Sequence, residues 1–235
     1  MGAVNLTKQT VNLTKNQVVN LSKQSEGLKK IMIALGWDEN TGGYKTVTET
    51  VQPGFFGKLF GAQARTVEKR VPIPRSGYDY DLDAWVGFMK NGEVRSTDDV
   101  CYYGRLNMSN INGQFAHHHG DNLTGAGDGD DEQITIDLDK IPDKYNGMVV
   151  GVTIYQGKSR NQKFGDISNL FVRVVDQADN FEICRYADSI SDEYSKCLTF
   201  IVGKLYKDKG EWQFKSAGYG TKDDSISDAI RNYKG

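Results

Sequence analysis

The residues best suited to chemistry lie in one stretch, residues 120–132, which combines five acidic side chains with one asparagine and four glycines. Crowded carboxylates repel one another, so folding this stretch by itself would cost free energy. A bound hard cation removes that cost, because calcium and magnesium take oxygen ligands. The glycines allow positive φ angles, which can turn backbone carbonyls inward as further ligands. Most acidic runs are only solvated turns, but this composition and glycine spacing favour a metal site.

A second acidic stretch, residues 78–88, has the pattern of a β-strand. With a two-residue period, its apolar side chains share one face suited to a core: Tyr80, Leu82, Ala84, Val86 and Phe88. The other face carries Asp79, Asp81 and Asp83, and no Lys or Arg lies within the stretch to neutralise them. We therefore expect this strand and the 120–132 loop to meet around one or more cations.

The two stretches supply the predicted metal ligands, which are Asp79, Asp81, Asp83, Asp121, Asn122, Gly125, Gly127, Asp128, Asp130, Asp131 and Glu132. The two glycines would contribute backbone carbonyls. The acids suffice for one or two calcium ions, each of which accepts about 6–8 oxygens in loose geometry. The spacing does not fit an EF-hand, because a loop starting at Asp128 or Asp79 lacks glycine at its sixth position. The ligands are therefore expected to come from separate loops of a β fold.

Three consecutive histidines, His117, His118 and His119, precede the acidic loop. They could indicate a transition-metal site or a general base. Consecutive side chains of a strand point to opposite faces, so all three cannot converge on one ion. We expect a polar strand end beside the acidic loop, with His118 close enough to sense the metal.

Composition and charge set the outer limits. The chain has 235 residues, 38% of them hydrophobic and 26% charged, which fits one large domain with a full core. The net charge of −2 gives no global basic surface for nucleic acid. The chain shows no signal-peptide pattern and no run near the roughly 18 apolar residues of a membrane span. Its three cysteines form no CxxC pair, so buried reduced thiols and a cytoplasmic location are expected.

The remaining pattern predicts a mainly-β fold, a sandwich of two sheets with few short helices. One five-residue unit occurs three times near the N-terminus, at residues 4–8, 11–15 and 19–23, and alternates apolar and polar residues like short strands joined by tight turns. Residues 31–37 form a continuous apolar run typical of a central strand. Further strands are expected at 133–138, 148–155, 170–175, 181–186, 198–206 and 211–216. Helices are expected at 192–196 and 223–233, the second burying Ile226, Ala229 and Ile230.

A family resemblance emerges from these motifs. The chain resembles the TerD family, named for bacterial tellurite resistance. The motifs that carry the resemblance are the repeated Val-Asn-Leu-Thr-Lys unit and residues 35–38, 79–84, 120–125, 127–132, 164–165 and 210–214. The resemblance covers nearly the whole chain. It implies a β-sandwich with a calcium site in the acidic loops, and a role in stress or toxic-anion resistance rather than known catalysis.

Two departures from the family pattern stand out, a third copy of the N-terminal unit and a long insertion at about residues 40–77. The insertion carries six basic and two acidic side chains, a net charge of +4, which leaves −6 for the rest of the chain. Its large apolar residues Phe55, Phe56, Leu59 and Phe60 could dock a protein partner or an anionic surface. The simpler interpretation is a hairpin whose tip packs on the sandwich, because residues 46–51 and 65–73 look extended.

Three functions fit these observations. The favoured one is a non-catalytic, calcium-binding stress-response module that acts through protein partners. The alternative is a metal-dependent enzyme with sugar-nucleotide or phosphoester chemistry at the Asp-x-Asp pattern, but no nucleophilic triad or phosphate-binding glycine loop accompanies it. A calcium-dependent carbohydrate binder is the third, and such proteins are usually secreted and disulfide-bonded.

Overall fold

The computed structural model of the protein describes residues 8–38, 41–52, 63–74, 77–125, 129–187, 194 and 196–234, with the backbone alone at 41–45 and 69–74. The chain divides into two compact units, one formed by residues 1–39 with 79–235 and the other by residues 40–78. Each unit is described by itself.

The first sheet of the larger unit contains, among the described residues, seven strands. In spatial order they are β1 (Val11–Asn12), β13 (Phe181–Tyr186), β12 (Phe171–Asp176), β3 (Lys30–Gly36), β10 (Glu132–Asp137), β9 (Gly113–His118) and β8 (Asn107–Asn110). The predicted apolar run at 31–37 forms the central strand β3 up to Gly36, and β3 pairs antiparallel with both β12 and β10.

The second sheet has six strands over the same described part of the chain. Their order is β2 (Val18–Asn20), β15 (Glu211–Thr221), β14 (Thr199–Asp208), β11 (Gly147–Ile154), β6 (Leu82–Met89) and β7 (Val100–Cys101). The β14–β15 hairpin turns at Lys209 and Gly210, whose φ angles of 51° and 85° suit the predicted tight turn.

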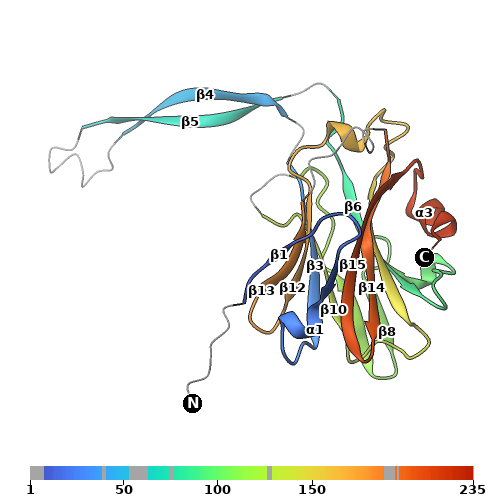
Figure 1. The fold of residues 1–235 in the computed structure, drawn as a ribbon. Helices are drawn as coiled ribbons and strands as arrows, with labels where there is room; N and C mark the ends of the chain where they lie inside the picture. Colours follow the sequence, from blue (N-terminus) through green and yellow to red (C-terminus); the bar gives the residue numbers. More distant parts are fainter. Residues whose placement is uncertain are drawn as a thin grey trace, which may run out of the picture. The chain divides into compact units, whose positions relative to one another are not determined.

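The two sheets face each other as a β-sandwich (Figure 1), which confirms the predicted fold class. The core lies between them, and β6 shows why the alternation of its sequence matters. The apolar residues predicted for its core face, namely Tyr80, Leu82, Ala84, Val86 and Phe88, all belong to this core. On the opposite face, Trp85 and Met89 pack with the C-terminal helix α3 (Ile226–Asn232). Because both faces of β6 are covered, any charged residue in it is buried unless it lies at a strand end.

The predicted C-terminal helix is confirmed, and the N-terminal repeats are only partly so. Ser225 caps α3, which buries Ile226, Ala229 and Ile230. The second and third repeats do not pair with each other as a hairpin would, because β1 joins the first sheet and β2 the second. The Asn20 side chain accepts a hydrogen bond from the Lys23 amide and so starts the short helix α1 (Leu21–Gln24) inside the third copy. Most of the first copy, like most of the predicted 192–196 helix, lies outside the described residues.

The smaller unit is a two-stranded antiparallel hairpin of β4 (Thr41–Val51) and β5 (Arg65–Pro74), in agreement with the extended segments predicted there. The register pairs Glu49 with Val67 and Val51 with Arg65. Val47, Val51 and Val67 therefore lie on one face, and each is about 40% exposed. The apolar cluster at 55–60 lies outside the described residues. That residues 40–77 are an insertion into a complete sandwich remains a prediction.

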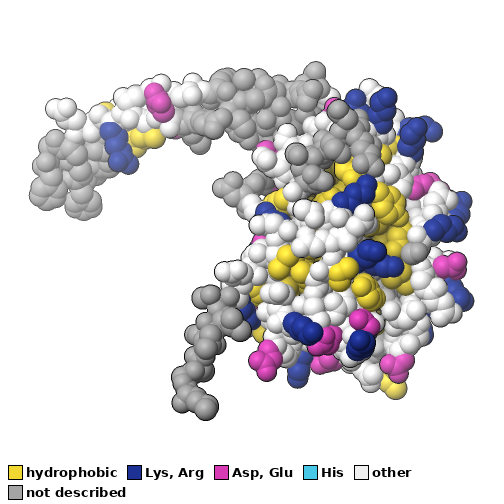
Figure 2. Space-filling model, in the orientation of Figure 1, with side chains coloured by type: hydrophobic (Ala, Val, Ile, Leu, Met, Phe, Trp, Pro, Cys, Tyr) yellow, Lys and Arg dark blue, Asp and Glu magenta, His cyan; other side chains and the backbone are white. Residues whose placement is uncertain are grey.

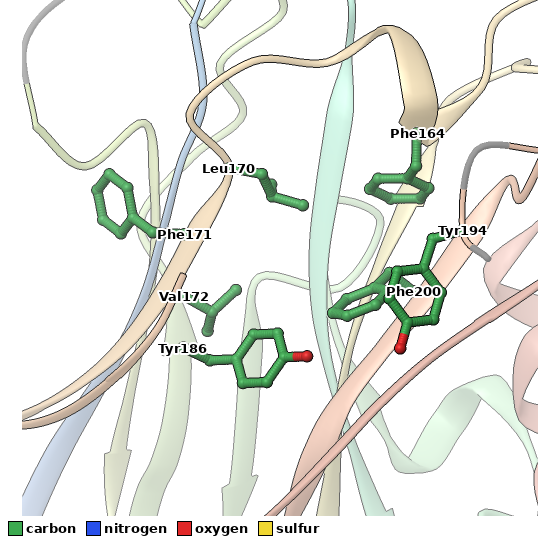
Figure 3. A pocket seen from close by; sticks show the side chains of 7 residues that line it. All are labelled: Phe164, Leu170, Phe171, Val172, Tyr186, Tyr194 and Phe200. Atoms are coloured by element: carbon green, nitrogen blue, oxygen red, sulfur yellow. The ribbon is translucent and has the colours of Figure 1, made fainter. Parts of the chain in front are cut away.

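The core is tightly packed near the start of β12. The side chains around a small apolar space there are Phe164, Leu170, Phe171, Val172, Tyr186, Tyr194 and Phe200 (Figure 3). Its volume of about 10 Å³ is at the lower limit for a single water molecule, so it is a packing defect rather than a ligand site. The three cysteines are buried, as expected.

Two observations bear on larger partners. None of the described helices is long and apolar enough to cross a membrane. On the face drawn in Figure 2, the described Lys and Arg side chains are spread over the surface and do not form one basic patch.

Candidate metal centre

Three acids from the two predicted stretches meet at one end of the sandwich. One carboxylate oxygen from each of Asp81, Asp83 and Asp121 lies within 4.8 Å of the others. Asp81 precedes β6 and Asp83 is its second residue, and only 5% and 3% of their surfaces are exposed. Asp121 is exposed and belongs to the loop between β9 and β10. The acidic strand and the acidic loop therefore meet, as the sequence predicts.

Glu132 completes the cluster from the opposite sheet. It is the first residue of β10 and is 1% exposed. Its Oε2 accepts a hydrogen bond of 2.6 Å from the backbone amide of Ala84 in β6. This amide is accessible because β7 pairs with β6 only at Val86 and Gly87. Beyond the end of β7, the Glu132 carboxylate thus accepts the hydrogen bond that a backbone carbonyl of a neighbouring strand would otherwise accept.

Burial and mutual repulsion disfavour charge on these acids. Burial, followed by the negative charges of Glu132, Asp81 and Asp121, raises the pKa of Asp83 to about 9. Burial is also the main cause that raises the pKa of Glu132 to about 9, and it raises the pKa of Asp81. A cation at this position would reverse the effect, because it stabilises the ionised carboxylates.

Several buried polar atoms of the described cluster have no hydrogen-bond partner, among them Asp81 Oδ1 and Glu132 Oε1. Leaving a buried polar atom unsatisfied costs about 1–3 kcal/mol, and more for a charged group. Both atoms are carboxylate oxygens, which are the ligands that hard cations prefer. The donor set therefore fits a calcium ion.

His118 lies against the same cluster. It is fully buried, and its Nδ1 accepts a hydrogen bond from the Gly120 amide, so Nε2 carries the hydrogen. Nε2 lies 3.5 Å from Glu132 Oε2. Burial lowers the pKa of His118, although the nearby Asp121 charge opposes this. The predicted closeness of His118 to the site is confirmed.

Two other predicted ligands hold the loop in place through different contacts. Both oxygens of Asp130 bind the Arg173 guanidinium, at 2.8 Å and 2.7 Å, so that this carboxylate is neutralised away from the cluster. Asp131 Oδ2 accepts from the Trp37 amide at 2.9 Å, and Asp131 Oδ1 accepts from the Asn122 side chain at 2.8 Å.

Asn122 and Gly125 shape the loop itself. The Asn122 Oδ1 atom accepts hydrogen bonds from the amides of Thr124 and Gly125, both at 3.1 Å. Gly125 has a φ of +67°, and a Cβ atom there would lie 2.3 Å from Trp37 Nε1. The position therefore requires glycine both for its backbone angle and for its close approach to Trp37.

The remaining predicted ligands are less well placed. Asp79 is exposed, and its backbone carbonyl accepts a hydrogen bond of 2.9 Å from Gln162. Gly127 and Asp128 lie outside the described residues.

A basic residue of the site, Arg160, is absent from the predicted set. Its Nη1 lies 3.4 Å from Asp81 Oδ2, and its guanidinium lies over the Tyr155 ring at 5.1 Å. Arg160 follows β11, whose last residue, Ile154, pairs with Leu82. The strand pairing brings the residues after 154 next to Asp81, and no sequence pattern around Arg160 predicts this contact.

An open cleft of about 360 Å³ adjoins the cluster and includes Asp83, Tyr103 and Tyr155 in its lining. The acidic cluster therefore borders this cleft through Asp83. Burial is also the main cause that raises the pKa of Tyr103 to about 12, with Asp83 as the next cause.

Comparison with known proteins identifies the family. The TerD domain matches residues 9–233. The chain belongs to the TerD family. It is 38% identical over 223 residues to the stress response protein SCP2 of Bacillus subtilis (strain 168), covering 95% of this chain and 98% of that protein. It is 32% identical over 212 residues to the tellurium resistance protein TerD of Serratia marcescens, covering 90% and 91% of the two chains.

A solved TerD-family structure has the same fold. A crystal structure of a homologue of telluride resistance protein (TerD) from Streptomyces coelicolor A3(2) superposes with a TM-score of 0.52 at 20% identity. The match covers 85% of this chain and 94% of that one. The resemblance to the TerD family that the motifs predict is thus confirmed, and its relatives are tellurium resistance and stress response proteins.

Proposed function

We propose that this TerD-family chain is a calcium-binding stress-response protein whose ion is held by Asp81, Asp83, Asp121 and Glu132. The relatives named above support the stress-response part of the proposal. The acidic cluster supports the calcium part. The proposal keeps the expected cytoplasmic location.

The observation that carries the proposal is the pair of buried carboxylate oxygens, Asp81 Oδ1 and Glu132 Oε1, that accept no hydrogen bond. Two further acids lie beside them, and within the described part of the chain Arg160 brings a single positive charge against these four carboxylates. Calcium suits this irregular set better than magnesium, because it accepts a variable number of oxygens, whereas magnesium needs a near-octahedral shell. Asp79, Asp128 and the Gly127 carbonyl remain candidates for a second ion.

The proposed role of the ion is structural. Asp83 belongs to the second sheet, Asp81 directly precedes the same strand, Glu132 belongs to the first sheet, and Asp121 lies in a connecting loop. An ion among them would bind both layers of the sandwich and the loop together. Calcium binding would thereby stabilise the folded state, because the unfolded chain does not bring these acids together.

The proposed mode of action is through protein partners and not through catalysis. The names of these relatives denote resistance and stress response, not a reaction. The 40–78 hairpin is the proposed contact, since one of its faces offers Val47, Val51, Val67 and the basic Arg65, together with the acidic Glu49. With the net charge of +4 over residues 40–77, the complementary partner is an acidic protein surface.

Calorimetric titration of chelator-treated protein with calcium tests the proposal. We expect wild-type protein to bind calcium more tightly than magnesium, and Asp83→Asn and Glu132→Gln to weaken calcium binding strongly. Asp139→Asn is the matched control, because Asp139 is exposed and lies outside the cluster. Equal calcium affinity in all four proteins, or no binding up to millimolar calcium, would show that this cluster is not the site.

A further inference from the structure

His117 and His119 lie together on the outer face of the first sheet, opposite the side that His118 occupies. Their ring centroids are 4.6 Å apart, with the ring planes at 71°. His117 lies in β9, and the backbone amide of His119 continues the pairing with β10 by donating to the Gln133 carbonyl. His117 is half-buried and His119 is exposed. Two imidazoles at a two-residue spacing on a strand therefore face solvent side by side.

The hydrogen bonds of His117 determine which of its nitrogens is free. Its Nδ1 lies 2.7 Å from Asn107 Oδ1. The same oxygen accepts a hydrogen bond from the side-chain amide of Gln114. A carbonyl oxygen can only accept, so Nδ1 of His117 carries the hydrogen. The lone pair of the neutral ring is then on Nε2, and Asn107 holds the ring in this tautomer.

The contacts of Thr135 determine which nitrogen of His119 is free. The Thr135 hydroxyl donates its hydrogen towards the His117 carbonyl, at 3.5 Å. Its oxygen lies 3.2 Å from His119 Nε2 and can therefore accept from it. His119 Nε2 then carries the hydrogen, and the lone pair is on Nδ1. Each ring of the pair thus keeps one nitrogen available as a ligand, while the other is held by a neighbour, as is usual for histidines that bind metals.

The surroundings select the kind of ion. Both rings line an open hollow of about 320 Å³, together with Gln114 and Gln177. The carboxylate in this hollow, Asp137, is paired with Lys30 at 3.6 Å and Lys140 at 3.0 Å. Among the described residues that line this hollow, no carboxylate is left unpaired for a hard cation, whereas imidazole nitrogen suits copper, nickel and zinc.

We propose that His117 Nε2 and His119 Nδ1 form a second metal site, which takes Cu²⁺ and, more weakly, Ni²⁺ and Zn²⁺. Imidazole nitrogens bind such ions at about 2.0–2.1 Å, and water fills the remaining positions. The order of affinities follows the general preference of nitrogen sites for Cu²⁺. The site lies on the outer face of the sheet, so it operates whether or not calcium occupies the acidic cluster.

The test uses the full chain without a polyhistidine tag, saturated with calcium. Cu²⁺ is titrated in the presence of a weak competing chelator, and the bound copper is examined by electron paramagnetic resonance. We expect a bound Cu²⁺ ion with coupling to two imidazole nitrogens. Loss of one ring removes the chelation, so His117→Gln and His119→Gln should each weaken binding roughly a hundredfold. Gln177→Ala, in the same hollow, is the control and should bind like wild type.

A positioning variant and a folding check sharpen the test. Asn107→Ala removes the acceptor that holds the His117 tautomer, and should weaken Cu²⁺ binding about tenfold without removing a ligand. Melting curves without copper should be nearly unchanged in all variants, because the altered side chains lie at the surface. If the double variant His117→Gln/His119→Gln binds Cu²⁺ as tightly as wild type, or if one nitrogen alone couples to the metal, the proposal is overturned.

Discussion

Glu132 and Ala84 connect the two layers of the sandwich, because the Glu132 carboxylate of β10 accepts a hydrogen bond of 2.6 Å from the Ala84 amide of β6. The second oxygen of the same carboxylate has no partner and lies in the acidic cluster. The Glu132 side chain thus satisfies the Ala84 amide at the edge of β6 and also offers a ligand to the proposed ion. Loss of the ion is therefore expected to affect the packing of the sheets as well as the acidic loop.

Removal of calcium should lower the stability of the fold. A ligand that binds only the folded state adds about 2.7 kcal/mol at a concentration of a hundred times its dissociation constant. We expect the melting temperature to rise by several degrees between excess chelator and saturating calcium, and Asp83→Asn to reduce this rise. Thermal unfolding followed by circular dichroism measures the difference. An identical melting temperature in chelator and calcium would contradict the proposed structural role.

The stability of the metal-free protein should depend on pH through Asp83. Its pKa is raised from 3.8 to about 9 in the fold, so its stabilising contribution is complete below about 3.8 and is lost as the pH rises through 9. Asp83→Asn cannot ionise and escapes this loss. In chelator, the variant should therefore gain stability relative to wild type as the pH rises from 5 to 9. Urea unfolding at several pH values checks the sign, and a constant difference would refute it.

Gly125 should be far less tolerant of a side chain than another glycine with a similar backbone angle. Gly125→Ala introduces a Cβ 2.3 Å from Trp37 Nε1, at a φ of +67°. In Gly27→Ala, at a φ of +72°, the new Cβ meets nothing within 4 Å. The left-handed backbone alone costs about 1–2 kcal/mol in both variants. Gly125→Ala should be more destabilised by urea unfolding and should also bind calcium more weakly, whereas Gly27→Ala should keep wild-type affinity.

Deletion of residues 45–74, with a short linker in their place, should leave a folded protein that binds calcium. The deleted segment forms most of a separate compact unit, and closing the loop with a short linker costs little free energy. Association with acidic protein partners from a cell lysate should be lost, and binding to anionic vesicles is measured in parallel. An unfolded deletion variant would place the segment in the core. Full retention of every association would exclude it as the contact.

The sequence by itself determined the local elements of this protein. The alternation at 80–88 predicts which face of β6 enters the core, and the apolar run at 31–37 predicts a central strand. Glycine at 210 marks the β14–β15 turn, and the pattern at 223–233 predicts α3. These features depend on residues a few positions apart, which is why their periodicity can be recognised in the sequence. The ordered acidic motifs were specific enough to indicate the family.

The tertiary structure decided which of the acids share a site. Asp81, Asp83 and Asp121 converge, whereas Asp130 is bound by Arg173, which comes from β12. Arg160 reaches Asp81 because β11 pairs with β6. Composition shows that acids are plentiful but not which of them a distant arginine will neutralise. That outcome depends on strand pairing between residues far apart in the chain, and so on the packing of the whole sandwich.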